Sequence, residues 1–298
     1  MDNEARKRNY IILAESFQED DEGLAAIAKY RKALAFTSRG PERIQILYRI
    51  ALINDELGQY EEAIDAYNKI LDLDQAEAGA YYGKAIAYEE IFEYGLARDN
   101  YLRAIEVYPK YHRAYYYLAN LYDKMDELDR AIENYKKVVE IEPGDYTSYN
   151  NLAGIYEELG DLDRAYYYVD RALKIRPDYY KALYNKGVIL GRLGDRDQAL
   201  KAYYSSIEAN PNYGNSYLNI SALYLGQAMY KETIELLTEG LAYNENDTNL
   251  YYNRACAYAL RGEDEKAIRD MNRAIELYPI QEEYARRDKD LKRFFEKE

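Results

Sequence analysis

The chain has 298 residues, of which 48% are hydrophobic and 32% are charged, and its formal net charge at pH 7 is -14. This composition is typical of a folded protein rather than of a disordered segment. The negative charge repels nucleic-acid phosphates and anionic lipid surfaces, so we expect neither a nucleic-acid partner nor a membrane partner.

Metal and redox chemistry are limited by a single cysteine, Cys256, and a single histidine, His112. One cysteine cannot form an intrachain disulfide, and nothing in the sequence requires an oxidising compartment. The N-terminal segment carries early carboxylates and lacks the apolar centre of a signal peptide, and no window approaches the roughly 20 apolar residues of a membrane span. We therefore expect a cytoplasmic protein with no metal site and no cofactor.

A period of 34 residues runs through the chain, and prolines recur at that step or at twice it: Pro109, Pro143, Pro177, Pro211 and Pro279. Each proline follows a similar segment, as in "NYLRAIEVYP" and "DMNRAIELYP". Proline cannot continue a helix, so it marks the end of one helix and precedes the next. The glycine of "EELGDLDRA" marks the turn between the two helices of a repeat.

Small and large residues keep the same step. Small residues recur at Ala51, Ala85, Ala119, Ala153, Gly187 and Ala255, and again at Ala63, Ala97, Ala131, Ala165, Ala199 and Ala267. Large residues recur at Tyr81, Tyr115, Tyr149, Leu183, Tyr217 and Tyr251, at Tyr88, Tyr122, Tyr156, Leu190, Tyr224 and Tyr258, and at Tyr67, Tyr101, Tyr135 and Tyr203. Small residues let paired helices approach closely, and large residues fill the space between layers.

In chain order, the pattern predicts helix-turn-helix repeats at 7–40, 44–77, 78–111, 112–145, 146–179, 180–213, 214–247 and 248–281. A closing helix is predicted at 282–298, where Tyr284, Leu291 and Phe295 should cover the last repeat and a charged face should meet water. Three extra residues at 41–43 make the first junction irregular. Repeat 214–247 departs most from the pattern, with Thr233 and Gly240 for alanine, and a hinge or a contact site stays open there.

The motif positions of one repeat are Tyr149, Leu152, Ala153, Tyr156, Ala165 and Pro177. Their order resembles the tetratricopeptide repeat family over nearly the whole length, with tyrosine in the aromatic places. The resemblance implies an all-α fold, a right-handed α-solenoid of about eight repeats that forms a single domain over 1–298. It implies little about biochemical activity, because the motif residues build the scaffold.

No constellation for catalysis is present. The sequence has no phosphate-binding loop, no Gly-rich dinucleotide turn and no H-E-x-x-H motif. Paired carboxylates such as Glu89 and Glu90 are expected on a solvated helix face rather than in acid-base chemistry, because the chain has 54 acidic residues. We therefore expect no enzyme.

In the family that the chain resembles, the second, fifth, ninth, twelfth and thirteenth places of each repeat face a groove lined by the first helices. These places predict a peptide-binding groove of Tyr48, Tyr82, Glu89, Tyr116, Asn120, Asp123, Asn150, Glu157, Tyr184, Arg192, Leu218 and Tyr252. Its N-terminal part is rich in tyrosine and acid, and its C-terminal third is apolar and nearly uncharged. The basic half of the clamp with which some members bind chaperone tails is absent at the matching places.

The stretch "RAYYYLANLYD" divides its tyrosines by this register. Tyr115 and Tyr122 belong to the recurring large series and are predicted in the core, whereas Tyr116 faces the groove. Tyr117 is expected to lie against the neighbouring repeat, and its role stays open.

Two functions remain after this reading. The first is a non-catalytic scaffold that binds a protein or peptide, extended or helical, through basic or aromatic groups, because tyrosine gives large contact area and carboxylates steer cations. The second is a structural module that self-associates and has no dedicated peptide ligand. The chain is expected to be a monomer or a weak homo-oligomer.

Overall fold

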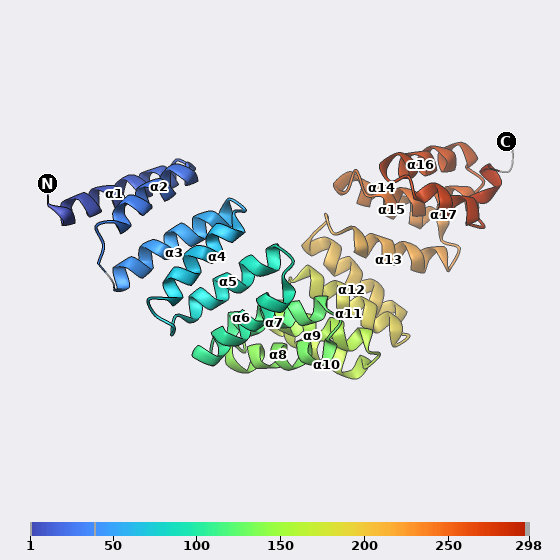
Figure 1. The fold of residues 1–298 in the computed structure, drawn as a ribbon. Helices are drawn as coiled ribbons and strands as arrows, with labels where there is room; N and C mark the ends of the chain where they lie inside the picture. Colours follow the sequence, from blue (N-terminus) through green and yellow to red (C-terminus); the bar gives the residue numbers. More distant parts are fainter. Residues whose placement is uncertain (1, 39, 296–298) are drawn as a thin grey trace. The chain divides into compact units, whose positions relative to one another are not determined.

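The computed structural model describes residues 2–38 and 40–295. The remaining residues, which include parts of the predicted repeat 7–40 and of the predicted closing helix 282–298, lie outside the described residues. The described part of the chain holds seventeen α-helices and one short 3-10 helix, with no strand among them (Figure 1). The predicted all-α solenoid of helical repeats is confirmed.

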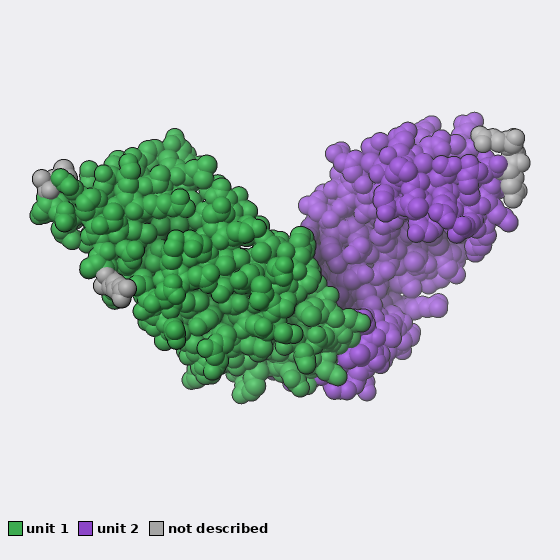
Figure 2. All heavy atoms as spheres, in the orientation of Figure 1, with its two compact units in different colours: residues 1–143 green, residues 144–298 purple. Residues whose placement is uncertain are grey.

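The helices divide into two compact units, residues 1–143 and residues 144–298, coloured separately in Figure 2. Within each unit every α-helix packs against the next one along the chain. Unit 1 contains α1 (Asn3–Glu19), α2 (Gly23–Leu34), α3 (Pro41–Glu56), α4 (Tyr60–Leu71), α5 (Ala78–Glu90), α6 (Tyr94–Val107), α7 (His112–Lys124) and α8 (Leu128–Ile141).

Unit 2 continues the alternation of first and second helices. It contains α9 (Tyr146–Glu158), α10 (Leu162–Ile175), α11 (Tyr180–Arg192), α12 (Arg196–Ala209), α13 (Gly214–Leu225), α14 (Tyr230–Tyr243), α15 (Thr248–Leu260), α16 (Asp264–Leu277), α17 (Gln281–Arg287) and the 3-10 helix η1 (Lys292–Phe294).

Tyrosines of the second helices form the deepest part of the core. Tyr67, Tyr101 and Tyr135 are fully buried, and Tyr203 is nearly so. Both series of small residues are buried as well, so the paired helices approach closely around these rings. A Cβ at Gly83 in α5 would lie 2.3 Å from the Tyr67 ring, so this contact requires a glycine.

The large series of the first helices is less uniformly buried than we predicted. Tyr122, Tyr149 and Tyr217 are buried, but Tyr115 is only partly buried. The prediction of Tyr115 as a core residue is therefore corrected, because the deepest aromatic position of its repeat belongs to Tyr135 on the second helix.

The turn between first and second helix brings one residue into the left-handed region. Gly58, Gly160, Gly194 and Gly262 have φ between 69° and 87° there, as the glycine of a helix C-terminus usually does. The matching residues of other repeats are not glycine: Phe92 has φ 63°, Asp126 has φ 61° and Ala228 has φ 58°. Such residues lose free energy to steric crowding.

The three extra residues at 41–43 form the first turn of α3, so the junction is a lengthened helix. Pro41 occupies the first helical turn, where its missing N–H costs no hydrogen bond. Arg43 Nη1 donates to the carbonyl oxygens of Leu34 at 2.9 Å and Thr37 at 3.2 Å. This cation satisfies carbonyl groups at the end of α2 and connects the two repeats.

The closing segment is shorter as a helix than we predicted. Helix α17 ends at Arg287, and residues 296–298 lie outside the described part. Leu291 is buried and Phe295 packs against the core of the last repeat, as expected. Tyr284 is 57% exposed, so the prediction that it covers this core is wrong; Ala285 is buried in its place.

Repeat 214–247 keeps both helices despite its unusual residues. A Cβ at Gly240 in α14 would lie 2.9 Å from the Tyr217 ring, so glycine makes room for this tyrosine. Helix α14 ends without a proline because the Asn244 side chain donates to the Gly240 carbonyl at 3.0 Å and to that of Pro211 at 3.1 Å. Tyr217 itself is fully buried, and its hydroxyl has no hydrogen-bond partner among the described residues.

Tyr217→Phe is expected to raise the free energy of unfolding by about 1 kcal/mol, because it removes a buried hydroxyl that makes no hydrogen bond. Tyr67→Phe is the matched control, since the Tyr67 hydroxyl donates to Asp55 Oδ2 at 2.7 Å. That control should destabilise the protein by about 1–2 kcal/mol. Urea unfolding followed by circular dichroism measures both, and equal losses in the two variants would contradict this account of Tyr217.

Candidate protein-interaction surface

The first helices of unit 1 carry tyrosines and polar side chains at helical spacing. Tyr82 and Glu89 lie seven residues apart on α5, and Tyr116, Asn120 and Asp123 follow at steps of four and three on α7. Residues at such steps share one face of a helix. We call the surface that carries Tyr48, Asp55, Tyr82, Glu89, Tyr116 and Asn120 the tyrosine face of unit 1.

Tyr82 lies at the centre of an aromatic cluster. Its ring centroid is 5.1 Å from that of Tyr111, 5.7 Å from that of Tyr117 and 6.2 Å from that of Tyr101. Tyr117 therefore packs against the preceding repeat, as expected. Burial and then the neighbouring tyrosines Tyr117 and Tyr111 raise the pKa of Tyr82, so its hydroxyl stays protonated.

Tyr116 reaches the same cluster from α7. Its ring is 5.5 Å from that of Tyr117 and 6.0 Å from that of Tyr135, and the side chain is partly buried. These contacts hold the ring in one orientation while part of its surface stays in water. A preordered tyrosine of this kind loses little entropy when it binds a partner.

Each buried tyrosine of a second helix holds a polar side chain of the first helix. The Tyr67 hydroxyl donates to Asp55 Oδ2 at 2.7 Å, and the Tyr101 hydroxyl donates to Glu89 Oε2 at 3.2 Å. In the next repeat, the Tyr135 hydroxyl donates to Asn120 Oδ1. The core tyrosines thus position the polar groups of the tyrosine face.

The carboxylates of this face lack a compensating cation. Among the described residues, neither Asp55 nor Glu89 takes part in an ion pair, and Asp55 Oδ1 is buried without a hydrogen-bond partner. Burial, and then the charges of Glu56 and Glu90, raise the pKa of Asp55 to about 6 against the hydrogen bond from Tyr67. Burial also raises the pKa of Glu89. A positive group brought to this face would stabilise both ionised carboxylates.

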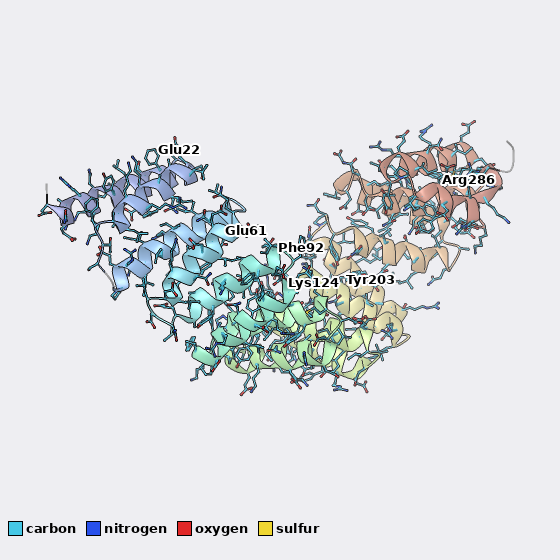
Figure 3. All side chains as sticks on the ribbon, in the orientation of Figure 1. Glu22, Glu61, Phe92, Lys124, Tyr203 and Arg286 are labelled. Carbon is cyan, nitrogen blue, oxygen red and sulfur yellow. The ribbon has the colours of Figure 1, made fainter. Side chains whose placement is uncertain are left out.

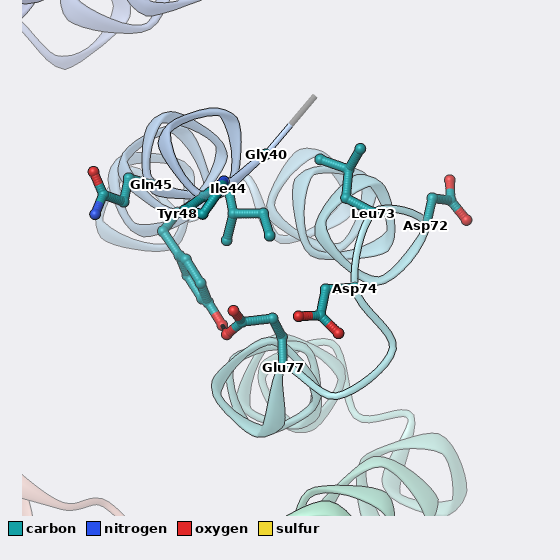
Figure 4. Close-up of a pocket in the computed structure, with 9 residues that line it drawn as sticks. Gly40, Ile44, Gln45, Tyr48, Asp72, Leu73, Asp74 and Glu77 are labelled. Atoms are coloured by element: carbon teal, nitrogen blue, oxygen red, sulfur yellow. Dashed lines mark hydrogen bonds between the residues drawn. The ribbon is translucent and has the colours of Figure 1, made fainter. Parts of the chain in front are cut away.

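Two hollows flank Tyr48. One, of about 410 Å³, lies between the start of α3 and the loop before α5. Figure 4 shows Tyr48 and Glu77 meeting across it, with the Asp74 carboxylate turned towards Glu77, and the Tyr48 hydroxyl donates to Glu77 Oε2 at 3.1 Å. The other hollow, of about 500 Å³, is lined by Ile11, Leu52 and other residues of α1 to α3.

In unit 2 the predicted residues are occupied with contacts inside the unit. Asn150 is only 6% exposed and its Oδ1 accepts from Asn185 Nδ2 at 3.0 Å, so it connects α9 to α11 instead of presenting a free surface. Glu157 Oε1 accepts from Arg192 Nη1 at 2.6 Å. The two predicted charges of this unit therefore neutralise each other.

The remaining predicted residues of unit 2 are partly buried. The Tyr184 ring lies 5.8 Å from that of Tyr203 and 5.2 Å from that of Tyr213. Leu218 packs against the core around α12 to α14. The Tyr252 hydroxyl donates to Asp288 Oδ2 at 3.2 Å.

Our reading of the sequence missed the tyrosines that precede the first helices. Tyr111, Tyr179 and Tyr213 stand at multiples of the 34-residue period, and Glu77 precedes them by one period. Tyr111 and Tyr213 contact the fifth-place tyrosines Tyr82 and Tyr184. The period itself was the signal that could have identified these positions.

Within the described residues, no group of three or more potential metal ligands is close enough to hold an ion. Across the same residues, no helix is both long and apolar enough to cross a bilayer.

Comparison with known families gives several matches. Models of the family described as "Tetratricopeptide repeat" match the chain at residues 44–77, 112–145, 134–167, 180–213 and 248–280. Together these ranges cover more than half of the 298 residues. No curated protein matches the chain in sequence.

Solved structures share the fold at low sequence identity. A MamA protein is 22% identical, with a TM-score of 0.51 over 56% of this chain and 91% of that one. YrrB, described as a TPR protein with an unusual peptide-binding site, is 22% identical, with a TM-score of 0.53 over 63% of this chain and 95% of that one. The Cut9–Hcn1 hetero-tetramer structure is 18% identical, with a TM-score of 0.58 over 89% of this chain and 52% of that one.

Asp55→Asn is expected to raise the melting temperature at about pH 8 and to leave it unchanged at about pH 5. Because the pKa of Asp55 is raised to about 6 in the folded protein, its ionised form destabilises the fold above that pH, and the penalty disappears as the pH falls through 6. Asparagine removes the charge and keeps an oxygen for the Tyr67 hydroxyl.

Differential scanning calorimetry at the two pH values measures this effect. Asp65→Asn is the control, because Asp65 is exposed on α4 and should show no comparable pH dependence. A stabilisation by Asp55→Asn that is equal at both pH values would contradict the assignment.

Proposed function

Because the chain belongs to the tetratricopeptide repeat family, we propose that it is a non-catalytic scaffold that binds a protein or peptide on the tyrosine face of unit 1. Stacked helix pairs of this kind offer a long row of first helices to a partner. The proposed ligand carries basic or aromatic groups.

The observation that carries the proposal is the pairing of partly buried tyrosine rings with uncompensated carboxylates. Tyr82 and Tyr116 are fixed by contacts with other rings, so they supply contact area at low entropy cost. Asp55 and Glu89 are held in place by hydroxyl groups from the core and have no cation beside them among the described residues. A lysine or arginine side chain complements such a surface in both charge and shape.

Unit 2 supports a different contribution to binding. Its Glu157 and Arg192 form an ion pair, and Leu218 with Ala222 and Leu225 adds apolar surface on α13. We propose that unit 1 provides the electrostatic selectivity and that unit 2 adds apolar contacts. The likeness to YrrB concerns the fold alone and is compatible with this division.

Tyr116→Ala is expected to weaken the binding of peptides selected from a random library against the intact chain by about 5-fold to 30-fold, or about 1–2 kcal/mol. Tyr167→Ala is the control, because Tyr167 is an exposed tyrosine on the second helix α10. Fluorescence anisotropy gives the affinities, and melting curves check that each variant is folded. Full binding by Tyr116→Ala would remove this residue from the site.

The same peptides should associate more slowly as salt is added, because carboxylates on the tyrosine face attract cationic ligands over a screening length of about 8–10 Å near physiological salt. Stopped-flow measurements from low to high ionic strength test this dependence. Selected peptides should be enriched in arginine, lysine or aromatic residues. Association that is indifferent to salt would place recognition on the apolar surface of unit 2 instead.

A further inference from the structure

Phe92 is the most exposed of the large hydrophobic side chains in the described residues. It is 73% exposed, in the turn between α5 and α6. Its φ of 63° places an aromatic residue in the left-handed region, at the position where Gly58 and Gly160 stand in other repeats. Exposure and backbone strain both cost free energy, and strain of this kind persists mainly at functional positions.

Neighbouring side chains support the Phe92 ring from one side. Its centroid lies 6.2 Å from that of Tyr94, and Lys124 Nζ lies 4.6 Å from the Tyr94 ring centroid. Figure 3 shows Phe92 at the turn that follows α5, with Lys124 at the end of α7. The ring is therefore oriented by its neighbours and still open to a partner.

Carboxylates surround this turn at the ends of two helices. Helix α3 ends with Asp55 and Glu56, helix α5 ends with Glu89 and Glu90, and neither helix has a basic residue in its last turn. The C-terminal end of a helix already carries partial negative charge, so carboxylates are unfavourable there. Among the described residues, Glu56 and Glu90 form no ion pair, and both are exposed.

Unit 2 shows what stabilises a carboxylate at the matching place. Glu157 near the end of α9 accepts from Arg192 at the end of α11, which stands 35 residues later. The residue 35 positions after Asp55 is Glu90, which has the opposite charge to Arg192. The step from α3 to α5 thus lacks the cation that the step from α9 to α11 contains.

We propose that Asp55, Glu56, Glu90 and Phe92, which we call the acidic edge of unit 1, dock a basic segment of a partner protein. An apolar side chain of that segment packs on Phe92, and an arginine or lysine takes the place beside Asp55 and Glu90 that Arg192 takes on Glu157. The proposal rests on the proposed function, because the acidic edge adjoins the tyrosine face through Asp55 and Glu89.

The test uses the full chain and a labelled synthetic peptide in which arginine and leucine alternate. Two further peptides replace every arginine by glutamate or every leucine by serine. Fluorescence anisotropy should show binding of the first peptide alone. Phe92→Gly and Glu90→Gln should each weaken that binding at least about fivefold, as the loss of a central contact does.

Ala228→Gly is the matched control, since it makes the same backbone change at another turn without altering charge. Glycine adopts positive φ without strain, so Phe92→Gly and Ala228→Gly should melt no lower than the unaltered chain. Only Phe92→Gly should lose affinity. A loss of binding with an undiminished melting temperature cannot come from unfolding.

Several results would overturn the acidic edge: no binding of the arginine–leucine peptide, equal binding of the glutamate peptide, or normal binding by Phe92→Gly and Glu90→Gln. Sedimentation that shows a dimer abolished by Phe92→Gly would assign the edge to a second copy of the chain and also overturn the proposal. If Tyr116→Ala weakens binding and Phe92→Gly does not, the tyrosine face stands and the edge fails. The reverse pattern supports the edge and rejects the tyrosine face.

Discussion

The contact on which the rest of this structure depends is that between a tyrosine of the second helix and the backbone of the neighbouring helices. Tyr67, Tyr101 and Tyr135 are buried where alanine and glycine leave no side chain to fill the space. The ring needs small neighbours, and the hydroxyl needs an acceptor, because an unpaired buried polar group is costly. Asp55, Glu89 and Asn120 provide these acceptors.

This arrangement couples the core to the surface. A carboxylate that accepts a hydrogen bond from a core tyrosine is partly withdrawn from water, and burial then raises its pKa. The first helices of unit 1 consequently present negative charge that the fold itself positions but does not neutralise. In unit 2 the same place in the repeat carries the ion pair of Glu157 and Arg192. One scaffold thus yields two chemically different surfaces.

Departures from the repeat are as informative as the repeat. Gly240 replaces an alanine because the Tyr217 ring occupies its space, which is a packing reason. Phe92 replaces a glycine where the backbone needs positive φ, and no packing contact requires an exposed aromatic ring there. The first departure improves the fold, and the second lowers its stability. Only the second asks for an explanation outside the isolated chain.

The sequence by itself determined the repeat and the helices, because proline, glycine and alanine recur every 34 residues and each has a local steric effect. It also placed Tyr82, Tyr116 and Glu89 on one helical face, since helical spacing is a local property. It could not distinguish Asn150 from Asn120, although both occupy groove-facing places of their repeats. Only the tertiary structure decided that Asn150 is buried against Asn185 and that Arg192 neutralises Glu157, because these contacts join residues 35 positions apart and depend on how neighbouring repeats stack.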